Sequence, residues 1–162
     1  MLILFILIAI LLILIIGALL WAYYKVFYSP KKDMSETESP IVLSNHPFSK
    51  PVQTHIEELA NTPCEYCKTR SFDKLLLSAR YYKGADDKPL CICFHGYRGS
   101  ALRDYSGIGL YLIYEGYPVL IVDERAHWHS KGHTITFGIK ERYDVLTWIR
   151  YANQRFGNEK PI

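Results

Sequence analysis

The sequence PLCICFHGYRGS, residues 89–100, is a short apolar run that passes directly into a glycine-rich loop. The run at 89–94 is typical of a strand buried on both faces of a sheet. Glycines in the loop let the backbone turn sharply and bring N–H groups close to a ligand. Residues 101–115 then predict a helix that ends at Gly116. Many α/β proteins share this strand, loop and helix.

A similar pattern follows towards the C-terminus. Residues 117–122 predict a second buried strand, and the polar loop 123–136 begins with the sequence DERAHWHSKG. Apolar residues spaced by three and four then predict an amphipathic helix, which Gly157 ends. The apolar stripe consists of Ile139, Tyr143, Leu146, Ile149, Ala152 and Phe156. Glu141, Arg142 and Asp144 lie off this stripe and are expected on a solvated face.

On the N-terminal side, residues 75–82 predict another strand, ended by the turn-forming residues 84–87. A short helix is expected over 55–60. Alternating strands and helices indicate an α/β fold with a mostly parallel sheet and helices on both faces.

Residues 2–24 contain no charged side chain and are long enough to cross a bilayer as a helix. Trp21, Tyr23 and Tyr24 stand at the end of this segment, where aromatic rings favour the headgroup zone. A cleaved signal peptide is the alternative, but the apolar run is longer than a signal core and has no basic start. We therefore expect a single-pass anchor in the cell membrane, with the lipid bilayer as partner.

The rest of the chain carries all 19 Lys/Arg and all 16 Asp/Glu residues. The net charge of +3 is small and scattered, which argues against nucleic acid as a partner. Lys25, Lys31 and Lys32 follow the apolar segment, so the positive-inside rule predicts a cytoplasmic domain. The proline-containing residues 25–60 are expected to form a juxtamembrane linker.

The loops at 95–99 and 123–132, about 28 residues apart, together resemble the α/β-hydrolase superfamily. Membrane-anchored bacterial serine hydrolases related to dienelactone hydrolases and acyl peptidases are the most similar branch. The family's HGxxG loop matches at His95, Gly96 and Gly99. Its D-x-R-[GA]-H-G-x-S-x-G loop matches at Asp123, Arg125, Ala126, His127, Ser130 and Gly132. The chain departs from that pattern at Trp128, where the family usually has glycine.

This resemblance implies a serine hydrolase that cleaves small-molecule esters, thioesters, amides or acyl substrates without a cofactor. Such enzymes carry a nucleophilic serine on a G-x-S-x-G turn and stabilise the oxyanion with two backbone N–H groups. The resemblance assigns one of these N–H groups to Tyr97. It gives His95 and His127 places in the two motifs, where we expect them to brace loops.

No G-x-S-x-G occurs in residues 1–162. In the family, the strand that leads to the nucleophile pairs with the strand that holds Cys91 and Cys93. Residues 61–162 are therefore expected to form a partial domain, truncated before the nucleophile and exposing a strand edge. The alternative is a degenerate, non-catalytic, membrane-tethered interaction protein.

Metal and redox sites have weak support in the sequence. Cys64 and Cys67 form a single C-x-x-C pair without a second pair nearby. His127, His129 and His133 lie on one loop but have no obvious fourth ligand. We therefore predict no metal site. Asp123 and Arg125 are expected to pair and brace their loop.

Overall fold

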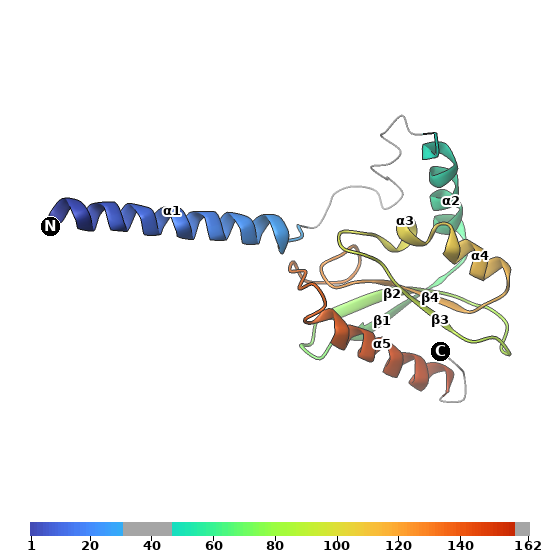
Figure 1. The fold of residues 1–162 in the computed structure, drawn as a ribbon. Helices are drawn as coiled ribbons and strands as arrows, with labels where there is room; N and C mark the ends of the chain where they lie inside the picture. Colours follow the sequence, from blue (N-terminus) through green and yellow to red (C-terminus); the bar gives the residue numbers. More distant parts are fainter. Residues whose placement is uncertain (31–46, 158–162) are drawn as a thin grey trace.

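The structure of the chain is a computed structural model that describes residues 1–30 and 47–157 (Figure 1). Lys31 and Lys32, on which the predicted orientation depends, and much of the predicted linker lie outside the described residues.

The chain begins with a long helix, α1 (Leu2–Val26), that projects away from the rest of the molecule (Figure 1). None of its 25 residues is buried against the domain. By length and composition this helix can cross a membrane. It is two residues longer than the predicted segment and includes Lys25 in its last turn.

A four-stranded sheet forms the centre of the domain, in the order β1-β2-β4-β3. Its strands are β1 (Glu65–Arg70), β2 (Leu76–Tyr82), β3 (Cys91–Phe94) and β4 (Val119–Asp123). The expectation of a mostly parallel sheet is wrong for this part of the chain, since only β3 and β4 are parallel. A short turn joins β1 to β2 and allows only antiparallel pairing, whereas helices connect β3 to β4.

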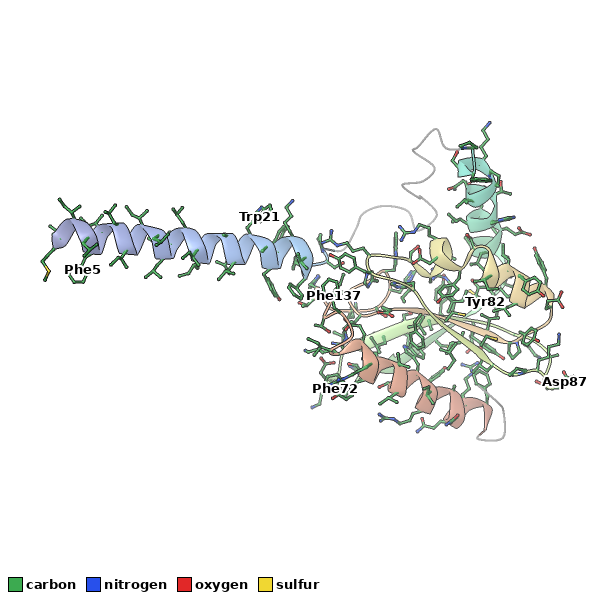
Figure 2. The ribbon with its side chains drawn as sticks, in the orientation of Figure 1. Phe5, Trp21, Phe72, Tyr82, Asp87 and Phe137 are labelled. Atoms are coloured by element: carbon green, nitrogen blue, oxygen red, sulfur yellow. The ribbon has the colours of Figure 1, made fainter. Side chains whose placement is uncertain are left out.

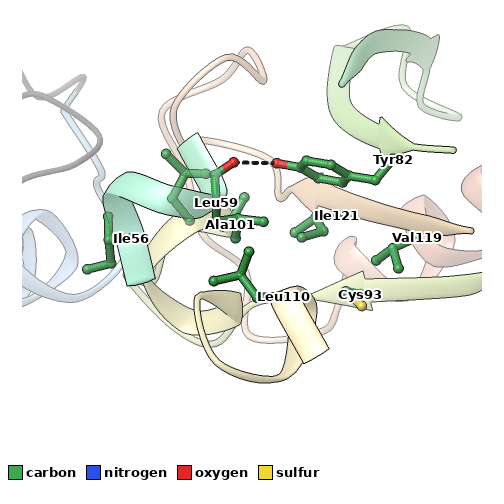
Figure 3. Packing of buried hydrophobic residues seen from close by; sticks show 9 residues of the cluster. Ile56, Leu59, Tyr82, Cys93, Ala101, Leu110, Val119 and Ile121 are labelled. Carbon is green, nitrogen blue, oxygen red and sulfur yellow. Dashed lines mark hydrogen bonds between the residues drawn. The ribbon is translucent and has the colours of Figure 1, made fainter. Parts of the chain in front are cut away.

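Helices cover both faces of the sheet, as expected for an α/β fold. One face packs against α2 (Ser49–Asn61), α3 (Ala101–Tyr105) and α4 (Ile108–Tyr114). The other face packs against α5 (Glu141–Phe156). Figure 3 shows the buried residues between the sheet and α2, α3 and α4. Tyr82 of β2 is one of them, and its hydroxyl donates a hydrogen bond to the Leu59 carbonyl at 3.3 Å. The α/β fold class is confirmed.

Two predicted boundaries change on the α2 side of the sheet. The helix expected over 55–60 lies within the longer α2, which buries Ile56 and Leu59 completely in the core, so the C-terminal end of the predicted linker belongs to the folded domain. The helix predicted over 101–115 is divided into α3 and α4, which are separated at Ser106 and Gly107.

The buried face of α5 differs from the predicted stripe. Its buried residues are Glu141, Asp144, Trp148 and Ala152. Of the predicted stripe, Ile139, Tyr143 and Leu146 are exposed. The solvated-face prediction is therefore wrong for Glu141 and Asp144, because both carboxylates have partners in the interior. Gly157 follows the helix with a φ of 86°, so the predicted glycine end is confirmed.

The strand β3 lies at one edge of the sheet that the described residues form. Cys93 is buried in the cluster beneath α3 and α4, and Cys91 packs against the same cluster. Ile92 and Phe94 point to the other face and are only half-buried. This apolar strand thus has an unpaired side among the described strands, as the sequence predicts.

Candidate functional site

The glycine-rich loop leaves the carboxyl end of β3 and turns tightly into α3. The Ser100 hydroxyl caps this helix by accepting a hydrogen bond from the Arg103 N–H at 3.1 Å. A Cβ atom at Gly99 would lie 2.0 Å from a carboxylate oxygen of Asp104. The same carboxylate accepts a hydrogen bond from the Gly96 N–H at 3.3 Å. Glycine at position 99 therefore lets Asp104 close the loop on itself.

His95 connects the two motif loops. Its Nε2 accepts a hydrogen bond from the Glu124 N–H at 3.1 Å, while Nδ1 lies 3.0 Å from the Gly96 carbonyl oxygen. This pair of contacts fits a neutral ring with its proton on Nδ1. Burial lowers the pKa of His95 and so favours the neutral form. The geometry agrees with the expected bracing role.

Tyr97 occupies the exposed tip of the glycine-rich loop. No residue among those described accepts a hydrogen bond from its backbone N–H. Its side chain is engaged elsewhere, because the hydroxyl donates to the Val26 carbonyl at 2.7 Å and the ring stacks on Phe137. The side chain thus fixes the loop tip, and the backbone N–H has no acceptor among the described residues.

The second motif loop is fastened to β2 by Ser130, which is completely buried. The Ser130 hydroxyl accepts a hydrogen bond from the Ser78 N–H at 2.8 Å and donates to the Asp123 carbonyl at 2.5 Å. Gly132, with a φ of 98°, has Leu75 against the position of a Cβ. Both residues have structural roles in holding the loop.

Trp128, the departure from the family pattern, has a φ of 38°. Left-handed backbone of this kind favours glycine, which explains why glycine is usual at this position. The indole N–H donates to the Gly99 carbonyl at 3.4 Å, so the bulky ring also ties the two motif loops together. His127 adds a further contact, with its ring 4.7 Å from that of His95 in an edge-to-face arrangement.

Asp123 and Arg125 do not pair with each other, contrary to the prediction. Asp123 lies 3.6 Å from the Arg80 guanidinium and 3.1 Å from the His129 ring. Arg125 instead binds Asp144 of α5 through two hydrogen bonds of 2.6 and 2.8 Å. Asp123 is the last residue of β4 and Arg125 follows it in the loop, so the two side chains have different partners although they are two residues apart.

Arg125 also binds Asp73, which lies between β1 and β2, at 3.1 and 3.3 Å. The hydrogen bonds from Arg125 hold the pKa of Asp73 well below its ordinary range, although burial acts in the opposite direction. One buried guanidinium therefore joins the second motif loop, α5 and the β1–β2 turn. The guanidinium is buried and its hydrogen bonds go to Asp144 and Asp73, so Arg125 positions the loop and is not placed to contact a substrate.

A small pocket lies beside this network. Its lining includes Phe94, Glu124, Glu141, Asp144 and Trp148. Burial, followed by the nearby Glu141 and Asp144 carboxylates, raises the pKa of Glu124 to about 7. The sequence analysis did not single out Glu124; its place directly after a strand that ends in Asp123 is the signal that could have found it.

Glu124 gives the domain a predictable pH dependence. Because folding raises its pKa from 4.5 to about 7, the folded state holds a proton that the unfolded chain has released. Stability therefore falls as the pH rises through this window. We expect Glu124→Gln to be about 1–2 kcal/mol more stable than the parent above pH 7, since the partly exposed side chain is screened. Below pH 4.5 the two proteins should unfold at the same urea concentration.

The exposed Glu115 provides the control for this prediction. Glu115→Gln should follow the parent at every pH. Equal stability of the parent and Glu124→Gln above pH 7 would show that the folded protein does not disfavour the ionised form of Glu124.

The cysteine and histidine groups considered as metal sites are separated in the fold. Cys64 packs against the cluster beneath α2, whereas Cys67 is buried on the opposite face of the sheet with α5. The His127 Nδ1 contacts the Arg125 carbonyl, and the His133 ring stacks on Tyr28.

Similarity to known proteins is found in solved structures. No protein-family model and no curated protein matches the chain. An esterase from Pyrococcus furiosus, Pf2001, aligns with 85% of this chain and 44% of its own, at 22% identity and a TM-score of 0.58. An alpha-beta hydrolase from Vibrio vulnificus aligns with 82% of this chain and 50% of its own, at 20% identity and a TM-score of 0.51. The chain therefore spans half or less of the length of these two structures.

Both structures are less than 25% identical to this chain. At such identities they establish architecture and leave the chemistry to the residues of the site. The described domain has the fold of the α/β hydrolases.

Proposed function

We propose that this chain supplies the membrane anchor and the first half of the active site of a serine hydrolase that cleaves an ester, thioester or amide bond. The observation that carries the proposal is the joined pair of motif loops at the carboxyl ends of the parallel strands β3 and β4. His95 and Trp128 hold these loops together, and the Tyr97 N–H lies at the tip with no described acceptor.

In the proposed reaction, a serine hydroxyl attacks the carbonyl carbon of the substrate and the carbonyl oxygen becomes negative. The Tyr97 N–H donates a hydrogen bond to that oxygen, where charge develops in the transition state. The leaving alcohol, thiol or amine departs with a proton, and water then releases the acyl group from the serine. Neither step calls for a metal or an organic cofactor.

The nucleophile, the acid and the base would come from outside residues 1–162. No strand among the described residues pairs with the outer side of β3, and this supports the proposal because a parallel strand added there would end beside the glycine-rich loop. Tyr97 would then face the nucleophile from the neighbouring strand end.

Hydrolysis of a p-nitrophenyl ester by the protein, expressed with its complete reading frame, tests this function. We expect turnover in detergent that a serine-directed fluorophosphonate abolishes. Turnover that survives the fluorophosphonate would contradict a serine mechanism. A folded protein without turnover on esters, thioesters or amides would favour the non-catalytic interaction protein, in which a partner covers β3.

A further inference from the structure

The end of the anchor helix is held by side chains of the glycine-rich loop. The last carbonyl groups of a helix lack partners within the helix and need donors from elsewhere. The Tyr97 hydroxyl donates to the Val26 carbonyl at 2.7 Å, and Arg98 donates to the Lys25 carbonyl at 2.5 Å. A guanidinium at this end of a helix is also favoured by the helix dipole. Tyr97 and Arg98 therefore cap α1.

The residues after α1 pair with the chain that precedes α5. The Ile135 N–H donates to the Phe27 carbonyl and the Ser29 N–H donates to the His133 carbonyl, both at 2.8 Å. Tyr28 and Thr134 form an antiparallel bridge between these hydrogen bonds. The anchor thus enters the domain through paired backbone, without a free spacer at this point.

An exposed aromatic ring lies beside this junction. Phe137 is 54% exposed, and its ring contacts those of Phe27 and Tyr97 at centroid distances of 5.5 and 4.8 Å. Its φ of 50° is a strained conformation for a side chain of this size. Glu141 holds the turn in place, since its buried carboxylate accepts hydrogen bonds from the Thr136 and Gly138 N–H groups.

Figure 2 shows Phe137 and Trp21 on the side of the domain from which α1 leaves, with Asp87 at the opposite end. If α1 spans a bilayer, Phe137 and the tip of the glycine-rich loop lie where the helix meets the headgroups. Aromatic rings favour that depth, and a nearby guanidinium can bind lipid phosphates. Contact with lipid would offset the cost of holding an apolar ring outside the core.

We propose that Tyr97, Arg98 and Phe137 form a bilayer-facing patch that seats this end of the domain on the membrane surface. The chemistry it fits is a phospholipid surface, with the rings among the headgroups and the guanidinium near phosphate. This seating does not depend on catalysis. If the proposed function also holds, the Tyr97 N–H lies at the membrane surface and acyl substrates reach it from the bilayer.

Photo-cross-linking to lipid tests the patch without any measurement of activity. The full chain is reconstituted into vesicles of phosphatidylcholine and phosphatidylglycerol that contain a trace of labelled phospholipid. Phe137 is replaced by p-benzoylphenylalanine, and Tyr114 of α4, which is 68% exposed, is replaced in a matched control. Phe5 of α1 is replaced in a third variant that reports membrane insertion.

We expect several-fold more labelled lipid on the position 137 variant than on the position 114 variant. Adding Arg98→Ala to the position 137 variant should reduce its labelling, because the loop then loses its hold on Lys25. Labelling at position 5 with equal or no labelling at positions 137 and 114 would overturn the proposal. Absence of labelling at position 5 would overturn it as well, since the patch depends on α1 lying in the bilayer.

Discussion

Replacing Arg125 with methionine is expected to destabilise the domain by about 3–5 kcal/mol, because it leaves a buried carboxylate without its partner. Arg125 is 4% exposed and makes four hydrogen bonds, two to Asp144 and two to Asp73. Asp144 is itself only 5% exposed, on the buried face of α5. The loss of stability should appear as a lower urea midpoint when unfolding in detergent is monitored by near-ultraviolet circular dichroism.

Two control variants separate the charge from the packing. Asp73→Asn should cost only about 1 kcal/mol, since the Asp73 side chain is 29% exposed and water can replace the interaction. The double variant Arg125→Met with Asp144→Leu should regain part of the loss, because apolar pairs often replace buried ion pairs well. A single Arg125→Met variant within about 0.5 kcal/mol of the parent would contradict the proposed network.

Trp148→Ala is expected to cost about 3–5 kcal/mol through the cavity it leaves under the sheet. Trp148 is completely buried in the cluster with Leu77, Leu120 and Val122, and it meets Tyr151 edge to face at 5.3 Å. No acceptor for its indole N–H is found among the described residues. Trp148→Phe should therefore cost less than about 1.5 kcal/mol, because it keeps most of the ring volume and removes an unsatisfied donor.

Leu146 on the same helix provides the matched control. It belongs to the predicted apolar stripe but is 48% exposed in the structure. Leu146→Ala should change the stability by about 0.5 kcal/mol or less, as is usual for surface positions. If Leu146→Ala costs more than Trp148→Ala, α5 packs through the predicted stripe and the observed helix face is wrong.

The buried face of α5 shows where sequence reasoning fails. Hydrophobic spacing favoured Tyr143 and Leu146 because it treats carboxylates as outward-facing. Asp144 turns inward because its partner, Arg125, comes from a loop on another element. Periodicity within one helix contains no information about such a partner. Glu141 turns inward for a similar reason, since it holds the turn that carries Phe137.

The strands and loops of the centre were more predictable. Continuous apolar runs at 89–94 and 117–122 identify β3 and β4, because β4 is buried along its whole length and β3 packs against the clusters on both faces of the sheet. The short polar β1 was missed, because only Cys67 of its six residues is buried. The helix expected over 55–60 is present as part of α2, but its start at Ser49 was not predicted, because the residues before position 55 include Pro51 and carry little apolar periodicity.

For the site, the sequence placed both motif loops at strand ends but misassigned some of their contacts. His95 braces the loops as predicted, through a hydrogen bond to a residue 29 positions later. Asp123 and Arg125 were paired by proximity, whereas in the fold Arg125 is drawn to two carboxylates distant in sequence. Local spacing predicts which residues share a loop, and tertiary packing decides which way each side chain points.

The rate of covalent labelling by a fluorophosphonate tests the proposed active site most directly. The protein is expressed with its complete reading frame, and mass spectrometry identifies the labelled residue. We predict labelling of one serine in a G-x-S-x-G sequence, slowed about 10²–10³-fold in Tyr97→Pro, which lacks the N–H that stabilises the oxyanion. Tyr97→Phe keeps that N–H and should label near the parent rate. A folded parent that is not labelled, or a folded Tyr97→Pro variant labelled as fast as the parent, would contradict the account.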